Sequence, residues 1–312
     1  MKRAAYQWQS GFSLFEMVVV IMIIAVVAGM TGLFIKAPLQ GYVDSARRAD
    51  LGDVADTAAR RLIHDIRTAL PNSVRVTSSG SAIYLEYLET VAGGRYNSAT
   101  TPAGCMLTGN CTALTTIGNL VSGVAGSSSL ELANGTGTLS ASAVVAVYNQ
   151  SNVCPSSSVY CGNNAAVITL ITNSGVNADE DVISFSATTF STGGSPNNRF
   201  QIVSGPVTYV CDPAAGTLTR YWGYAIQSAV PVPPLASATS AVLASHVSDC
   251  SFAYAYVRES LGVGQSAVAV TLLLTLAESG VDGQVESIRL YNAAHVSNEL
   301  GLYGAAHVSN MP

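Results

Sequence analysis

The hydrophobic pattern divides the chain into a continuous apolar stretch, an amphipathic stretch and a long remainder with alternating polarity. Between Phe12 and Ile35, all but five of the 24 residues are apolar. As a helix with a rise of about 1.5 Å per residue, this segment is roughly 36 Å long, enough to cross a bilayer core of about 30 Å. Its one ionisable residue, Glu16, is costly in hydrocarbon and therefore marks a functional position that needs a partner.

Residues 36–71 are predicted to continue this helix in amphipathic form, up to Pro71. Asp44 and Arg48, and likewise Asp56 and Arg60, are four residues apart and are expected to form ion pairs on the polar face. The opposite face is apolar and must be buried against another part of the chain, and the downstream strands are the candidates. Its apolar residues recur every three or four positions: Leu51, Val54, Ala55, Ala58, Leu62, Ile66, Ala69 and Leu70.

After Ser73 the pattern changes to a period of two, which predicts strands. A first hairpin is expected from residues 74–77 and 83–87 around Ser79-Gly80, and a closing hairpin from residues 267–276 and 285–291 around Ser279-Gly280. Further strands are predicted between them, at residues 144–148, 167–172, 182–185, 200–203, 207–211, 218–224 and 250–256.

Two stretches lack a strand pattern. Residues 91–139 are rich in Gly, Ser, Thr and Asn and are expected to form a long irregular excursion, and residues 224–243 are expected to form a Pro/Ala/Ser-rich connection. Near the end, residues 293–298 (AAHVSN) recur as residues 305–310. Two copies are too few for a solenoid, so they indicate either two similar terminal strands or a local duplication.

Composition points to an extracytoplasmic β-rich protein. Charged residues make up 11% of the 312 and aromatic residues 7%, with a net charge of −5, which gives no support for nucleic-acid binding. The sequence holds no H-E-x-x-H, G-x-S-x-G or P-loop pattern. We therefore expect no enzymatic activity, catalytic residue, metal site or cofactor.

The six cysteines all follow the apolar segment, and an even number in that position predicts disulfides formed in an oxidising compartment. Six cysteines allow 15 connectivities. Because short loops close at the lowest entropy cost, local pairing is expected. The expected bonds are Cys105–Cys111, Cys154–Cys161 and, from the remaining pair, Cys211–Cys250.

The ten residues before Gly11 are polar and carry Lys2 and Arg3 but no acid, as in a cytoplasmic leader. If a peptidase cuts after Gly11, Phe12 gains a positively charged amine four residues from Glu16. That amine is a suitable partner for a Glu16 carboxylate, most simply the carboxylate of a neighbouring copy.

This arrangement resembles the prepilin signal of type IV pilins and type II secretion pseudopilins. The resemblance implies that a prepilin peptidase cuts between Gly11 and Phe12 and methylates the Phe12 amine, and that Glu16 acts in assembly. It also implies an α+β, pilin-like fold, with the long N-terminal helix packed on an antiparallel, disulfide-bearing β-rich head. The expected parts are a leader (1–11), a membrane-spanning and filament-core helix (12–35), an amphipathic continuation (36–71) and a periplasmic or extracellular head (72–312).

Two stretches, residues 60–76 and residues 199–224, look like the MshO-type minor pilins of mannose-sensitive haemagglutinin (MSHA) pili. The resemblance implies a subunit at or near the fibre tip that helps start assembly and contributes to surface attachment. Its partners would be the prepilin peptidase, other major and minor pilins and the inner-membrane assembly platform. Before assembly it would sit in the inner membrane of a Gram-negative bacterium with its head in the periplasm. The alternatives are a J-type secretion pseudopilin and a membrane-anchored adhesin of another class.

Overall fold

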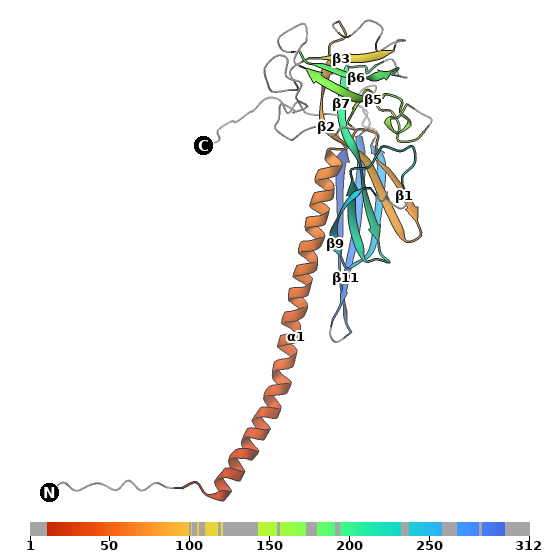
Figure 1. Ribbon diagram of the computed structural model, residues 1–312. Coiled ribbons are helices and arrows are strands. Elements are labelled where there is room, and N and C mark those ends of the chain that lie inside the picture. Colours follow the sequence, from red (N-terminus) through yellow and green to blue (C-terminus); the bar gives the residue numbers. More distant parts are fainter. Residues whose placement is uncertain are drawn as a thin grey trace, which may run out of the picture. The chain divides into compact units, whose positions relative to one another are not determined.

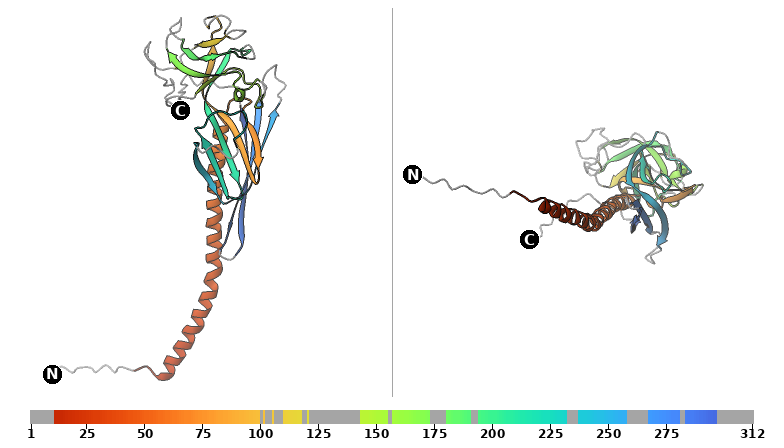
Figure 2. Two further views of the ribbon diagram at one scale, coloured as in Figure 1. Left: turned by 45° about the vertical axis from the view of Figure 1, so that its right-hand side comes forward. Right: turned by 90° about the horizontal axis from the view of Figure 1, so that it is seen from below.

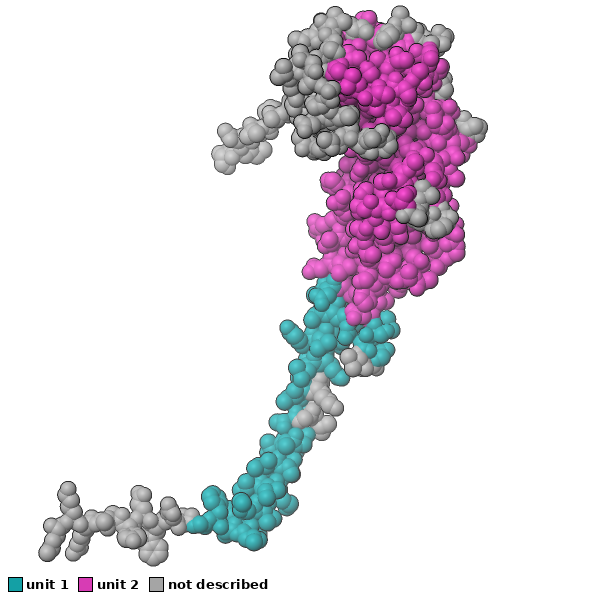
Figure 3. Space-filling view, in the orientation of Figure 1, with its two compact units in different colours: residues 1–50, 279–286 teal, residues 51–278, 287–312 magenta. Residues whose placement is uncertain are grey.

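The structure is a computed structural model of the chain (Figure 1). It describes residues 11–99, 101, 105, 110–117, 120, 143–154, 157–172, 180–190, 194–231, 237–257, 267–280 and 283–296. Residues 1–10 of the expected leader and the second copy of the terminal repeat lie outside these ranges. The chain forms two compact units, residues 1–50 with 279–286 and residues 51–278 with 287–312 (Figure 3).

One helix, α1, runs from Leu14 to Arg67 and continues through Pro38. It ends three residues before the expected Leu70, because Ala69 already forms a β-bridge with Glu89. The Leu70 amide likewise donates to a carbonyl of the sheet, that of Leu88, at 2.7 Å. The last turn of the predicted helix is therefore part of the sheet hydrogen bonding.

The body is built of antiparallel strands in two sheets. The larger sheet has the order β1-β2-β3-β6-β5-β4-β7-β8-β9, and the smaller one β10-β11-β12. The strands are β1 (Arg75–Ser79), β2 (Ala82–Tyr96), β3 (Cys111–Ile117), β4 (Val144–Ala146), β5 (Ala165–Thr172), β6 (Val182–Thr188), β7 (Arg199–Asp212), β8 (Thr217–Trp222), β9 (Thr239–Ser245), β10 (Val247–Val257), β11 (Ala267–Ser279) and β12 (Val285–Val296), with a 3₁₀ turn η1 at Val159–Cys161.

The long strands β2 and β7 give the larger sheet two parts. They pair along most of their lengths, from Ile83–Cys211 at one end to Arg95–Arg199 at the other. One part is the open sheet β1-β2-β7-β8-β9, and in the other the pairing β2-β3-β6-β5-β4-β7 returns to β2 and closes a ring. The ring encloses its own core, which includes Phe200, Leu114 and Ile183.

The C-terminal part of α1 supplies one wall of the main core. Its buried side chains belong to one core cluster with Leu85 and Tyr209 of the open sheet and with Leu272 and Leu274 of the three-stranded sheet. They include helix residues whose spacing predicted an apolar face: Leu51, Ala55, Ala58, Leu62 and Ile66. The ribbon views show this end of α1 lying beside the strands (Figures 1 and 2). An apolar N-terminal helix followed by an antiparallel β-rich body is therefore confirmed.

Three disulfides are present in this body. Cys105 is bonded to Cys111 and Cys154 to Cys161, which closes two short loops. Cys211 in β7 is bonded to Cys250 in β10, so this bond joins the two sheets across the main core.

Some expectations about local structure are wrong. The stretch 224–243 is not wholly a connection, because Thr239 begins β9 and pairs with Trp222 of β8. The stretch 91–139 is not wholly irregular, because β2 continues to Tyr96 and residues 111–117 form β3. Both hairpins are confirmed: β1 pairs with β2 around Gly80, and β11 is the neighbour of β12.

Candidate functional site

The peptide bond between Gly11 and Phe12 lies outside regular structure, in the segment that precedes the first turn of α1. Phe12 is 77% exposed. A Cβ atom added at Gly11 would meet no atom within 4 Å, and the Gly11 backbone is not in the left-handed region that favours glycine. The fold itself therefore gives no reason for glycine at this position.

Glu16 lies in the first turn of α1 and is exposed. The Ser13 side chain caps this turn, because its Oγ accepts a hydrogen bond from the Glu16 amide at 3.2 Å. The positive end of the helix dipole favours a carboxylate here. This local effect gives Glu16 a structural role within one chain, alongside the pairing with an amine that the sequence predicts.

Every residue from Gly11 to Thr31 is exposed, although most are apolar. Residues Leu14–Thr31 are long and apolar enough to cross a membrane. An apolar surface of this extent is unfavourable in water, so it needs lipid or other apolar helices around it.

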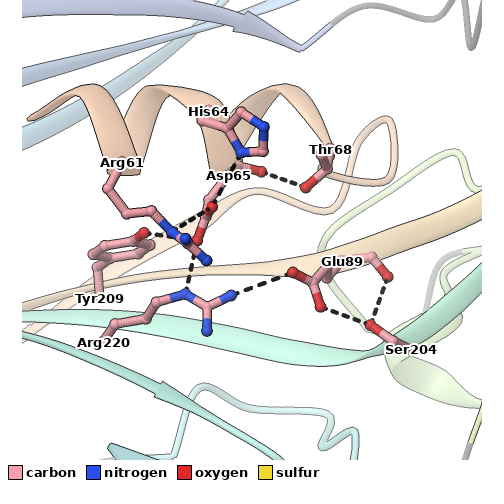
Figure 4. Close-up of polar contacts among 8 residues, drawn as sticks. All are labelled: Arg61, His64, Asp65, Thr68, Glu89, Ser204, Tyr209 and Arg220. Carbon is pink, nitrogen blue, oxygen red and sulfur yellow. Dashed lines mark hydrogen bonds and ion pairs between the residues drawn. The ribbon is translucent and has the colours of Figure 1, made fainter. Parts of the chain in front are cut away.

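The amphipathic part of α1 is held to the sheet by a polar cluster centred on Asp65 (Figure 4). The Asp65 side chain is only 4% exposed. Its Oδ2 accepts hydrogen bonds from Arg220 Nε at 2.7 Å and from the Tyr209 hydroxyl at 2.9 Å. Its Oδ1 lies 3.0 Å from Arg61 Nε. One helix carboxylate is thus bonded to two neighbouring strands, β7 and β8.

Arg220 extends the cluster to β2. Its second nitrogen donates to Glu89 Oε1 at 3.2 Å, and Ser204 donates to Glu89 Oε2 at 2.9 Å. Burial alone raises the pKa of the Asp65 carboxyl, but Arg220, the Tyr209 hydroxyl and Arg61 outweigh it, so the pKa lies below its usual value. Asp65 is therefore ionised at neutral pH in spite of its burial.

A second buried pair joins Arg75 of β1 to Glu86 of β2. Arg75 Nε donates to Glu86 Oε2 at 2.9 Å, and the remaining Arg75 nitrogens donate to the carbonyls of Gln227 and Ser228. The guanidinium also lies 3.6 Å above the centre of the Tyr160 ring, which favours a cation. Burial raises the pKa of Glu86 to about 7, although Arg75 opposes this shift.

Sequence reasoning singled out Gly11, Phe12 and Glu16 but missed both buried pairs. For Asp65 a signal was present. The buried residues 51, 55, 58, 62 and 69 follow an alternating spacing of four and three, and position 65 continues that series. A carboxylate on the apolar face of a helix predicts a buried cation nearby.

The predicted ion pairs on the other face are only partly present. Asp56 pairs with Arg60 at 2.5 Å as expected. Asp44 instead pairs with Arg47 at 3.3 Å, and Arg48 pairs with Glu286 of β12 at 2.5 Å. Among the described residues, no group of three or more His, Cys, Asp or Glu side chains is placed to hold a metal ion.

Comparison with known proteins identifies the N-terminal segment. Residues 9–32 match the family model described as the prokaryotic N-terminal methylation motif. The match covers Gly11, Phe12, Glu16 and the first part of the exposed apolar helix. No curated protein and no solved structure matches the chain.

The motif supports a type IV pilin-like protein. It favours a structural subunit over an enzyme. It implies processing by a prepilin peptidase and assembly with other pilins, and together with the apolar helix it fits a membrane-anchored pilin.

Proposed function

We propose that this protein is a minor pilin of an MSHA-like type IV pilus, which helps to start fibre assembly at or near the tip. The observation that carries the proposal is the methylation motif at residues 9–32, on a helix whose apolar first part is fully exposed. Such a helix can be held in a membrane before assembly and among other pilin helices afterwards.

The finer assignment to the MshO type is supported by the buried contacts of the head. The two stretches that resemble MshO-type minor pilins are residues 60–76 and 199–224. Asp65 of the first stretch is bonded to Tyr209 and Arg220 of the second. The resemblance therefore falls on residues that together attach the helix to the sheet, where a family would share its architecture.

The proposed maturation begins with cleavage between Gly11 and Phe12. The bond lies ahead of the helix and Phe12 is exposed, so a membrane peptidase can reach it without unwinding α1. The fold does not require glycine at position 11, so we assign Gly11 to recognition by the peptidase. Methylation of the new Phe12 amine follows, and the mature subunit then passes from the inner membrane to the cell-surface pilus.

In the proposed assembly, Glu16 binds the N-terminal amine of a neighbouring pilin. A carboxylate among apolar helices is costly unless a cation meets it. A subunit at the extreme tip has no earlier neighbour to supply that cation. Glu16 therefore supports a position beneath another minor pilin, within the tip complex and not at its outermost point.

The variant Glu16→Leu tests this assembly step. We expect normal cleavage and membrane insertion but weak co-purification with the other minor pilins, and fewer surface pili. Ser13→Ala is the matched control, since it removes the helix cap from the same turn and leaves the carboxylate in place. Equal co-purification of Glu16→Leu and the parent, with normal numbers of pili, overturns the placement.

The second candidate is a J-type pseudopilin of type II secretion, which the same N-terminal motif also favours. Deleting the chain in its native bacterium separates the two. The pilus assignment predicts loss of surface pili with normal protein secretion. A secretion defect with normal pili assigns the protein to the secretion system. If both pili and secretion are normal, the protein is a membrane-anchored adhesin, and the deletion strain should then attach less well to surfaces.

A further inference from the structure

The three disulfides differ in how closely solvent approaches them. Cys154 and Cys161 are both half-buried, and the residues beside them, Val153 and Gly162, are exposed. All four cysteines of the other two bonds are buried, with an exposed fraction of 5% or less. A thiolate must reach a sulfur atom before it can exchange with a disulfide. The Cys154–Cys161 bond is therefore the accessible one of the three.

This accessible bond ends on the short turn η1, which carries Tyr160. Ser158 caps the turn, because its Oγ accepts a hydrogen bond from the Tyr160 amide at 3.3 Å, and Gly162 ends the turn in the left-handed conformation. A helical turn of three residues is too short to be stable by itself. Its position therefore depends on the disulfide to Cys154 and on the contacts of its side chains.

Three side chains, which we call the clamp, bind the segment between α1 and β1, residues 71–74. Each donates to a backbone carbonyl of that segment: Tyr160 to Ser73 at 2.9 Å, Asn149 to Pro71 at 2.9 Å and Asn152 to Val74 at 2.5 Å. Asn72 also donates from its side chain to the Asn149 carbonyl at 3.0 Å. Ser73 and Val74 are buried, and a buried carbonyl needs a donor. The clamp therefore holds the helix–strand junction in place.

Tyr160 also supports Arg75, the first residue of β1. The Arg75 guanidinium lies 3.6 Å from the centre of the Tyr160 ring and donates to Glu86 Oε2 at 2.9 Å. Tyr160 is itself buried, in one core cluster with Leu70 and Leu88. A turn that is tied down by the accessible disulfide thus contacts both the helix–strand junction and the buried ion pair beside it.

We propose that Cys154–Cys161 is a site of reversible thiol–disulfide exchange, and that its redox state locks or releases the helix–strand junction. The partner is a protein with a reactive dithiol. One of its thiolates attacks a sulfur of the bond and forms a mixed disulfide, and the other cysteine leaves as a thiolate. The partner's second thiol then attacks its own sulfur in the mixed disulfide and releases the remaining cysteine.

This exchange gives the Cys154–Cys161 pair two electrons and two protons, and the partner leaves as a disulfide. An oxidised partner of the same class reverses the step. Reduction leaves η1 without its covalent tie, so the clamp loosens and residues 71–74 open locally. The central pairing of β2 with β7 does not involve the turn and is retained. The proposal follows from the fold alone and does not depend on the pilus role.

Limited reduction of the full chain in detergent micelles tests the accessibility. The folded protein is treated with dithiothreitol, free thiols are alkylated at intervals, and the peptides are mapped. We expect Cys154 and Cys161 to be alkylated about tenfold faster, or more, than the other four cysteines. Equal rates for the three bonds, or earlier opening of a buried bond, overturn the proposal.

Hydrogen exchange tests the lock, with the double variant Cys154→Ser, Cys161→Ser. Exchange of residues 70–76 should become about tenfold faster, while β7 stays protected as in the parent. Cys105→Ser with Cys111→Ser is the matched control, because it removes the other short-loop disulfide and should leave residues 70–76 unchanged. The parent protein, reduced and alkylated at this pair alone, gives the same measurement without refolding a variant.

Tyr160→Phe separates the clamp from the disulfide, because it removes the hydroxyl that binds Ser73 and keeps the bond. It should speed exchange of residues 70–76 by about threefold or more and leave all three disulfides formed. Reoxidation of the reduced parent should restore its protection. Unchanged exchange of residues 70–76 after loss of the Cys154–Cys161 bond overturns the proposal, and so does a loss of protection that extends through β7.

Discussion

At the scale of single residues, Asp65 decides how firmly the helix is attached to the sheet. It accepts bonds from β7 and β8 at one oxygen and an ion pair from its own helix at the other. A buried carboxylate of this kind is stabilising only while all of its partners remain, because each partner left alone is a buried charge or donor without compensation.

Asp65→Asn should lower the free energy of unfolding by about 3 kcal/mol at pH 7. This value is at the lower end of the range for a broken buried ion pair, because Arg220 still has its ion pair with Glu89. Asp56→Asn is the matched control, since it makes the same change in an i,i+4 pair whose Asp side chain is 47% exposed. Its effect should stay under about 0.5 kcal/mol. Denaturant titration of the full chain in micelles measures both, and equal effects contradict the assigned role.

Asp65 also makes a prediction about pH. Because its pKa is lowered in the folded state, its contribution is present above the unfolded pKa and is lost as the pH falls through the folded pKa. The difference in free energy of unfolding between the parent and Asp65→Asn should therefore become smaller at acid pH. If this difference stays constant down to the lowest pH at which the parent is folded, Asp65 is not ionised in the folded state.

Glu86 should act in the opposite direction. The pKa of Glu86 rises from 4.5 to about 7 on folding. Its contribution to the free energy of unfolding is therefore largest below pH 4.5 and declines as the pH rises toward 7. Glu86→Gln removes the titration. The stability of the variant relative to the parent should therefore increase by at most about 3 kcal/mol between pH 4.5 and 7. Unfolding curves at several pH values measure the change, and parallel curves would refute the raised pKa.

At the scale of elements, the Cys211–Cys250 bond is the covalent link between the two sheets. Its loop holds 38 residues, and the chain-entropy estimate gives a contribution of about 4 kcal/mol. Replacing both cysteines by Ala should therefore cost about twice as much stability as the same change at Cys105 and Cys111, whose five-residue loop gives about 2 kcal/mol. Non-reducing peptide mapping of the parent comes first, and a cross-link such as Cys111–Cys154 would contradict the pairing.

Sequence pattern predicts the elements whose burial is periodic. The spacing of Leu51, Ala55, Ala58 and Leu62 identifies the buried face of α1, and alternation in residues 285–291 identifies β12. In contrast, β9 was missed because its first four residues are all exposed and carry no alternation, and it is held by pairing with β8.

The candidate site divides in the same way. Gly11, Phe12 and Glu16 are close in sequence, so their combination can be recognised without a fold. The partners of Asp65 are more than 140 residues away in the chain, at Tyr209 and Arg220. Residue type and spacing contain no information about such pairs until the strand order is known.

At the scale of the whole molecule, the chain combines a fully exposed apolar helix segment with a folded, disulfide-bonded body. The proposed role of the whole protein depends on this segment being a prepilin signal. Its most direct test is the intact mass of the protein purified from cells that contain a prepilin peptidase. We predict a chain of 301 residues (312 − 11) that begins with a methylated Phe12.

Gly11→Leu supplies the control for that measurement. Because a Cβ atom at position 11 would meet no atom within 4 Å and the residue lies ahead of α1, this variant should keep the parent stability and yet remain uncut. We expect the parent to have the mass of 301 residues with one added methyl group, and the variant to have the mass of the full 312 residues. A parent protein that retains residues 1–11 in peptidase-competent cells would contradict it.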